Sequence, residues 1–141
     1  MDKPRRVFLS TSTSDESLRE AVTRNLQQGG INVWSDRDIV PGQSWVDSVG
    51  KAVRDSEAFV VLMTPAWENS RHGLAELGFV MSEQQDTGKP LIPVQVTDAQ
   101  PLLLQKDFAF VDGRGLQPRE VAERVRQAID ESLGHAPAAA V

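Results

Sequence analysis

The chain of 141 residues contains no cysteine, no tyrosine and only two histidines. The absence of cysteine excludes disulfides, thiolate nucleophiles and cysteine-based zinc sites. The histidines, His72 and His135, are far apart in the sequence and do not form the closely spaced pair that is typical of a zinc-binding helix. We therefore predict no metal site.

Long apolar runs and an excess of basic residues are also missing. No stretch approaches the roughly 18 consecutive apolar residues of a membrane-spanning helix, and the start of the chain does not have the pattern of a signal peptide. The net charge is −5, whereas a nucleic-acid surface requires a basic patch. We expect a cytoplasmic protein that binds neither nucleic acid nor a membrane.

Short apolar runs alternate with segments in which apolar residues recur at helical spacing. The runs predict strands over residues 6–11, 31–34, 58–64, 91–96 and 108–111. The other segments predict helices over residues 15–28, 45–53, 73–85 and 121–133. Pro93 lies inside the fourth run and counts against a central position for that strand.

This alternation indicates one α/β domain with a parallel sheet covered by helices on both faces. We expect a five-stranded, flavodoxin-like sheet of order 2-1-3-4-5, in which ligands bind at the carboxyl ends of the strands, where the first and third strands meet. The domain is expected to cover residues 1–134, and residues 135–141 are expected to form a flexible tail or linker.

Two predicted loops, residues 10–15 and 64–72, border this crevice. The first offers the hydroxyl groups of Ser10, Thr11 and Ser12, which can cap a helix or bind a phosphate. The second leads into the helix that contains Glu76. This carboxylate is either a solvated helix residue or a catalytic group.

Two tryptophans have open roles at this stage. Trp45 either packs in the core, as its spacing to Val49 and Val53 suggests, or contacts a ligand. Trp67 lies in a polar loop and is expected to be exposed.

Three segments of the chain resemble Toll/interleukin-1 receptor (TIR) domains. Residues 7–10 resemble the first box of that family, a strand that ends in a serine. The loop after the second strand resembles the R-D-x-x-P-G box through Asp36, Arg37, Asp38, Pro41 and Gly42. Residues 60–65, with Ser70 and Glu76, resemble the Ser-x-Trp-x-x-x-Glu region of enzymatic TIR domains, with His72 in the place of the tryptophan.

The resemblance, which covers about residues 5–133, implies a TIR domain of the bacterial NAD-consuming type. In that case Glu76 is catalytic, NAD+ is the substrate, and no cofactor is needed. The implied substrate-binding residues are Ser10, Thr11, Ser12, Trp45 and His72, with the last two on opposite walls of one cleft. The loop of residues 36–43 is implied to contact other TIR domains in a homo-oligomer or filament.

The chemistry needs only one carboxylate, because nicotinamide is cationic in NAD+ and leaves as a neutral molecule. The carboxylate then stabilises the positive charge that develops on the ribose. Attack by water gives ADP-ribose, and attack by an adenine nitrogen of the same molecule gives a cyclic isomer. A fused or separate sensor domain is expected to activate the enzyme in antiphage defence or a stress response.

Two other functions remain open at the level of sequence. One is a TIR module that only associates with other TIR modules, as an adaptor. The second is a nucleoside deoxyribosyltransferase-like enzyme, which also breaks an N-glycosidic bond beside a glutamate. A phosphoacceptor receiver domain is rejected, because Met63 and Thr64 stand where it needs an acidic residue. A flavodoxin is disfavoured, because residues 10–15 contain no glycine.

Overall fold

The protein is represented by a computed structural model that describes residues 5–96 and 108–134. The expected tail, residues 135–141, lies outside this part of the chain. In chain order the elements are β1 (Arg5–Ser10), α1 (Glu16–Gln28), β2 (Ile31–Trp34), the 3₁₀ turn η1 (Asp36–Asp38), α2 (Trp45–Asp55), β3 (Ala58–Met63), α3 (Pro65–Glu68), α4 (Arg71–Thr87), β4 (Leu91–Gln95), β5 (Val111–Asp112) and α6 (Pro118–Ser132).

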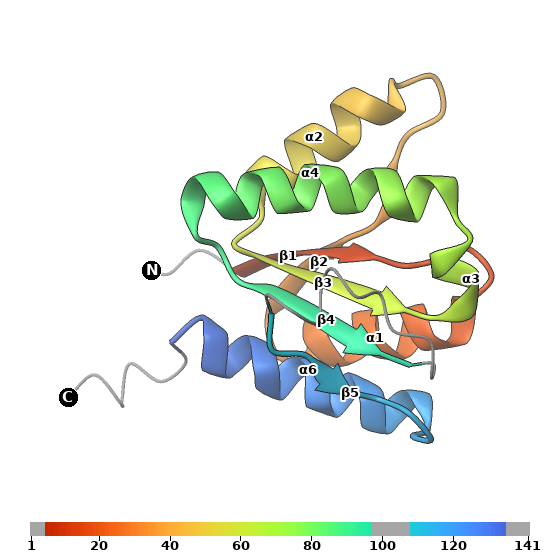
Figure 1. Cartoon of the computed structure of the whole chain (residues 1–141), viewed down its shortest axis with the longest axis vertical. Coiled ribbons are helices and arrows are strands. Elements are labelled where there is room, and N and C mark those ends of the chain that lie inside the picture. Colours follow the sequence, from red (N-terminus) through yellow and green to blue (C-terminus); the bar gives the residue numbers. More distant parts are fainter. Residues whose placement is uncertain (1–4, 97–107, 135–141) are drawn as a thin grey trace.

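The five strands form one parallel sheet in the order β2-β1-β3-β4-β5. Helices α2 and α4 cover one face of the sheet, above it in Figure 1, and α1 and α6 cover the other. This arrangement confirms the predicted flavodoxin-like fold and its strand order. The carboxyl ends of β1 and β3 are neighbours, as the predicted crevice requires.

Hydroxyl side chains set the starts of three helices on the α2/α4 side. Ser44, Thr64 and Ser70 each accept a hydrogen bond from a backbone N–H in the first turn of the following helix. Thr64 thus begins α3, a four-residue helix with Pro65 in its first turn, which the sequence analysis did not predict. Gly88 ends α4 in the left-handed conformation, with φ of 76°.

The strand predicted over residues 108–111 is shorter and lies further along the chain. β5 consists of Val111–Asp112 only. This short strand also explains how Pro93 is accommodated in β4. The Val96 N–H donates to the Met63 carbonyl in β3, so the alternation along the strand directs the Pro93 nitrogen toward β5. Pairing with β5 begins only at Val94, and the proline therefore lies beyond the end of that ladder.

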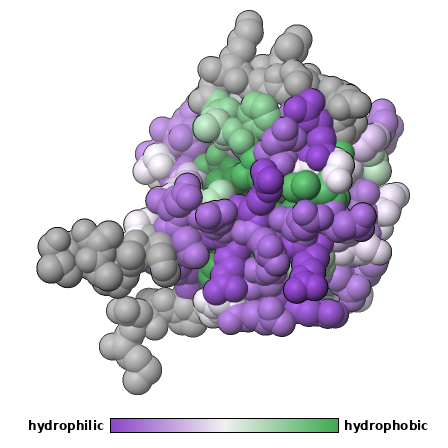
Figure 2. Space-filling model, turned by 90° about the horizontal axis from the view of Figure 1, so that it is seen from below, coloured by the Kyte–Doolittle hydropathy of each residue, from purple (hydrophilic) through white to green (hydrophobic). Residues whose placement is uncertain are grey.

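The sheet separates two hydrophobic layers. Among the described residues, the hydrophobic side chains of the α1/α6 layer are all aliphatic, with Val, Leu, Ile and Ala from the strands and the two helices. The α2/α4 layer contains the buried aromatic rings of Phe8, Phe59 and Trp67. Figure 2 views the molecule from the α1/α6 side and shows a mostly hydrophilic outer surface with a smaller hydrophobic area. Within the described residues, no helix is long and apolar enough to cross a membrane.

Candidate active site

Glu76 lies on the inward-facing side of α4. The buried residues of this helix are Gly73, Glu76 and Val80, which recur at the spacing of one helical face. Glu76 is only 1% exposed. A solvated helix glutamate would be directed to the opposite side, so the geometry removes the simplest structural explanation for this carboxylate.

Ser10 holds Glu76 from the end of β1. Side chains alternate along a strand, which directs Phe8 and Ser10 into the α2/α4 layer. The Ser10 hydroxyl donates to Glu76 Oε1 at 2.6 Å. It also accepts a hydrogen bond from the Trp67 indole N–H at 2.9 Å. The three side chains form a chain from α3 through β1 to α4.

The expectation that Trp67 is exposed is wrong. Its side chain is fully buried in the α2/α4 layer, and α3 lies beyond the carboxyl end of β3 (Figure 1). Gly73 makes this position possible, because a Cβ atom there would lie 2.7 Å from Trp67 Nε1 and 2.8 Å from Cδ1. Only glycine allows α4 to pass this close to the indole ring.

Asp36 is the member of the site that the sequence analysis assigned only to the assembly loop. It lies in η1, where the Ser35 N–H donates to the Asp38 side chain at 2.9 Å and fixes the turn. Glu76 Oε2 and Asp36 Oδ1 are both buried, and no described donor reaches either atom. Asp36 is hydrogen-bonded to Glu76 on α4. Nothing in the sequence around Asp36 predicts this interaction with a helix 40 residues further along the chain.

Burial is the main cause that raises the pKa of Glu76 to about 10. Hydrogen bonding with the Asp36 carboxyl and the negative charge of Asp36 raise this pKa further, whereas the Ser10 hydroxyl opposes the shift. Burial and Asp36 both therefore favour the protonated form of Glu76. A carboxyl group with such a displaced pKa at the carboxyl edge of a parallel sheet is a typical feature of an active site.

Trp45 and His72 lie against each other. Their rings stack with centroids 4.6 Å apart and planes inclined by 23°, so they form one surface instead of the expected opposite walls. His72 is one helical turn before Glu76 on the same face of α4. Trp45 is half-buried against the core and its indole N–H has no acceptor among the described residues. Trp45 therefore packs against the core and also keeps an indole N–H that a ligand can bind.

Thr11 and Ser12 follow β1 directly. The Ser12 hydroxyl accepts from the Ser14 N–H at 3.2 Å, which is a local turn interaction. Thr11 Oγ1 is buried without a partner among the described residues. A groove of about 410 Å³ lies nearby on the α1/α6 side, lined in part by Asp15, Thr64 and Pro65. Glu76 does not line this groove.

The 36–43 loop has an exposed tip. Pro41 and Gly42 are exposed, and Gly42 has a φ of 94°, which favours glycine. Arg37 forms an ion pair with Glu16 on α1. The loop is thus held at its start by η1 and Arg37, and it presents its second half to solvent.

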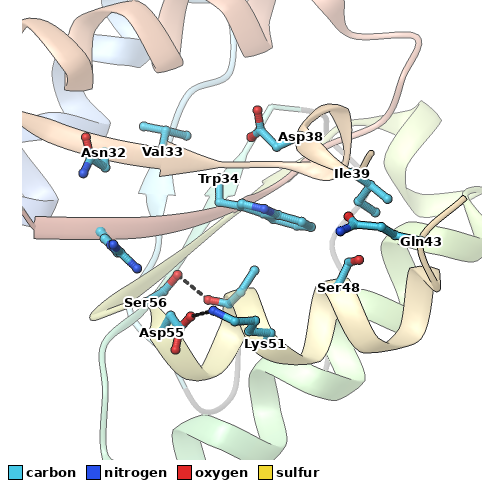
Figure 3. Close-up of a pocket in the computed structure, with 12 residues that line it drawn as sticks. Asn32, Val33, Trp34, Asp38, Ile39, Gln43, Ser48, Lys51, Asp55 and Ser56 are labelled. Atoms are coloured by element: carbon cyan, nitrogen blue, oxygen red, sulfur yellow. Dashed lines mark hydrogen bonds and ion pairs between the residues drawn. The ribbon is translucent and has the colours of Figure 1, made fainter. Parts of the chain in front are cut away.

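A second groove, of about 400 Å³, lies on the other side of this loop (Figure 3). The loop contributes Asp38, Ile39 and Gln43 to it, and α2 contributes Ser48 and the Lys51–Asp55 ion pair. The Trp34 ring projects into the space between β2 and α2 and stacks on Phe8 at 5.3 Å. Glu76 does not line this groove either. No three His, Asp or Glu side chains of the described chain converge into a possible metal site.

The fold and the site together define a flavodoxin-like α/β domain with a buried carboxyl group beside the switch point of the sheet. The sequence model of the TIR domain matches residues 7–130, nearly the whole chain. The protein therefore belongs to the TIR domain family, as its sequence motifs predict. No curated protein is significantly similar to it in sequence.

Solved structures share this fold at low sequence identity. The TIR domain of the Toll-related receptor TRR-2 from Hydra magnipapillata is 20% identical, with a TM-score of 0.65 over 75% of this chain and 82% of that chain. The TIR domains of the activated Roq1 resistosome are 21% identical, with a TM-score of 0.63 over 92% and 76%. The CMP N-glycosidase BcmB of Clostridium botulinum is 15% identical, with a TM-score of 0.63 over 87% and 99%.

Proposed function

We propose that this TIR domain cleaves the nicotinamide–ribose bond of NAD+ and releases nicotinamide together with ADP-ribose or a cyclic ADP-ribose isomer. The observation that carries the proposal is the Glu76 carboxyl, buried at the carboxyl edge of β1 and β3 and held by Ser10. A structural neighbour, BcmB, is described as an N-glycosidase. Breaking an N-glycosidic bond is therefore chemistry that this architecture accommodates.

The bond that breaks joins ribose C1′ to a cationic pyridinium nitrogen. Nicotinamide takes both electrons of this bond and leaves neutral, so no side chain has to protonate it. Positive charge accumulates on the ribose, and a preorganised carboxyl group in a water-poor site stabilises it. The cationic nicotinamide ring favours the ionised form of a nearby carboxyl group. Substrate binding thus opposes the burial that keeps Glu76 protonated.

The stacked pair of Trp45 and His72 is the proposed contact for a nucleotide ring. Its exposed member, His72, offers a flat face on which a base can stack. The indole N–H of Trp45 and the Thr11 hydroxyl have no partner among the described residues, so they are suited to polar groups of the substrate. Because Glu76 is almost fully buried, the side chains above it must shift before a ribose can reach it.

Assembly is part of the proposal. The exposed tip of the 36–43 loop, with Val40, Pro41 and Gly42, is suited to contact a second copy of the domain. We propose that this contact supports activity in a homo-oligomer, and that a fused or separate sensor triggers it in the cytoplasm during defence or stress. An adaptor without catalytic activity would use the same loop and would leave the burial of Glu76 unexplained.

The test is incubation of the protein with NAD+ over a range of protein concentrations, followed by chromatographic identification of the products. We expect nicotinamide release, with a specific activity that rises with protein concentration. Glu76→Gln should lower the rate by about a hundredfold or more, since loss of a charge-stabilising group costs about 3 kcal/mol. Glu20→Gln, an exposed glutamate on α1, is the matched control and should not change the rate.

The same assay distinguishes the alternatives. CMP and a 2′-deoxynucleoside, supplied in parallel, test cleavage of other N-glycosidic bonds. Preferential cleavage of the deoxynucleoside would favour the deoxyribosyltransferase-like enzyme. No cleavage of any of these substrates by an assembled sample would favour the adaptor. Full activity in folded Glu76→Gln would remove Glu76 from the mechanism.

A further inference from the structure

Two carboxyl groups from distant parts of the chain meet in this site. Asp36 comes from η1 after β2, and Glu76 comes from α4 after β3. Asp36 Oδ1 and Glu76 Oε2 are both buried, and no donor among the described residues reaches them. Glu76 Oε1 is occupied, because it accepts from the Ser10 hydroxyl.

The number of protons on the pair follows from this geometry. With no proton, two adjacent buried negative charges would repel each other and both oxygens would lack a donor. With one proton, one carboxyl donates to the other, both oxygens are satisfied, and a single negative charge remains. The Asp36 hydrogen bond that favours the protonated form of Glu76 is consistent with this state.

We propose that Asp36 and Glu76 act as one unit that holds a single proton, and that Asp36 sets the protonation state in which Glu76 meets its substrate. Asp36 is thus a positioning residue that acts through Glu76. The use of the pair in catalysis rests on the proposed NAD+ cleavage. The existence of the pair rests on the hydrogen bonding between the two carboxyl groups and on the burial of their oxygens.

Among the described residues, no cation is a cause of the shifted pKa of Glu76. Ser10 from β1 and Trp67 from α3 are uncharged. Arg37 is next to Asp36 but pairs with Glu16, and His72 is exposed and stacked on Trp45.

The acidic groups on the neighbouring elements are Glu68 on α3, Asp47 and Asp55 on α2, and Asp38, which caps the Ser35 N–H in η1. None of them is among the causes of the raised pKa of Glu76. Asp36 is therefore the charged group that adds to the effect of burial on the pKa of Glu76.

The experiment is a carboxyl titration followed by NMR of protein labelled with ¹³C at the glutamate side chain, with Glu76→Gln used to assign the Glu76 signal. In the unmodified protein Glu76 should titrate far above the ordinary value of 4.5. Asp36→Asn should lower its midpoint by about one pH unit or more, because the neighbouring charge is removed. The midpoint should stay above the ordinary value, since burial is unchanged.

The matched control is Asp38→Asn. It removes the same charge from the same turn, and the asparagine oxygen can still accept from the Ser35 N–H. The Glu76 midpoint should stay within about 0.3 unit in this variant. An equal shift in both variants, or no shift in Asp36→Asn with an intact amide spectrum, would overturn the proposed pair.

The pH dependence of NAD+ cleavage connects the pair to function. If the ionised form of Glu76 is the reactive one, the acid limb of kcat/KM should move to lower pH in Asp36→Asn. A titration shift without any NAD+ cleavage by the unmodified protein would refute the proposed function and support the pair. Cleavage by the unmodified protein, with a Glu76 midpoint and an acid limb that Asp36→Asn does not move, would refute the pair and leave the proposed function intact.

Discussion

The two layers that cover the sheet differ in chemistry. Among the described residues, the hydrophobic side chains of the α1/α6 layer are all aliphatic. The α2/α4 layer combines large rings with buried polar groups, and Ser10, Trp67 and Glu76 are linked there by hydrogen bonds. Aliphatic packing has no directional requirement, whereas each buried polar group needs a partner at a defined position.

This difference separates stability from the candidate site within one small domain. Changes in the aliphatic layer are expected to act through the amount of folded protein. Changes in the polar network are expected to act on the chemistry of Glu76 as well. Variants of the two layers should therefore differ in whether they change stability alone or also the chemistry of Glu76.

The first prediction concerns the aliphatic layer. Leu26 on α1 is 0% exposed, and Leu26→Ala should lower the free energy of unfolding by about 2–5 kcal/mol through lost packing and a cavity. Urea denaturation measures this. The control is Leu74→Ala on α4, since Leu74 is 53% exposed and should change the value by less than about 0.5 kcal/mol. If folded Leu26→Ala also lost its NAD+ cleavage per molecule, the division between layers would not hold.

The second prediction is a dependence of stability on pH through Glu76. In the unfolded chain Glu76 ionises near 4.5, and in the folded protein its pKa is raised to about 10. Between these values the folded state binds more protons than the unfolded state, so the free energy of unfolding falls as pH rises through this window. A shift of even two units corresponds to about 2.7 kcal/mol.

Glu76→Gln should flatten this dependence, because the amide NH2 can donate to Asp36 at every pH and its oxygen can accept from Ser10. Denaturation of both proteins at several pH values between 5 and 9 measures the difference. Glu20→Gln should keep the slope of the unmodified protein. Parallel curves for Glu76→Gln and the unmodified protein would mean that Glu76 is ionised in the folded state.

The third prediction uses two glycines of α4. Gly73→Ala brings a Cβ atom into contact with the Trp67 ring, so it should cost about 1–3 kcal/mol of stability and disturb the hydrogen bond to Ser10. Gly78→Ala is the control, because a Cβ there meets nothing within 4 Å, and it should stabilise the helix by about 0.5–1 kcal/mol. Melting temperatures that change in the same direction would contradict this role of Gly73.

The fourth prediction concerns His72. If its ring contacts the nucleotide, His72→Ala should raise KM about fivefold, a loss near the lower end of the 1–3 kcal/mol of base stacking. His72→Trp restores the residue that is more common in the family motif and should keep or lower KM. An unchanged KM in His72→Ala, measured by initial rates, would assign His72 only to the stack with Trp45.

The sequence predicted the strands of the sheet better than it predicted the contacts of the site. The strands over residues 6–11, 31–34, 58–64 and 91–96 match the structure to within one residue at each end, since apolar periodicity determines them. α3 was missed although Thr64 and Pro65 are ordinary start signals, because a four-residue helix has no periodicity to detect.

Within the site, the strand and helix pattern identified Glu76 and Ser10, and the resemblance to the TIR family added His72. Glu76 and Ser10 are joined by a hydrogen bond. The burial of Trp67 could not be predicted, because it depends on a glycine in the next helix. The contact of Asp36 with Glu76 joins two segments that are distant in the sequence, and only the packing of η1 against α4 brings them together.

The distribution of tryptophan gives the protein a built-in optical probe. Trp34, Trp45 and Trp67 all belong to the α2/α4 layer, the α1/α6 layer contains none, and the chain has no tyrosine. Indole emission excited at long wavelength therefore reports on the environment of one layer alone. Loosening of α1 or α6 would be silent in this signal while far-ultraviolet dichroism records it, and the two spectra together show which side of the sheet has come apart.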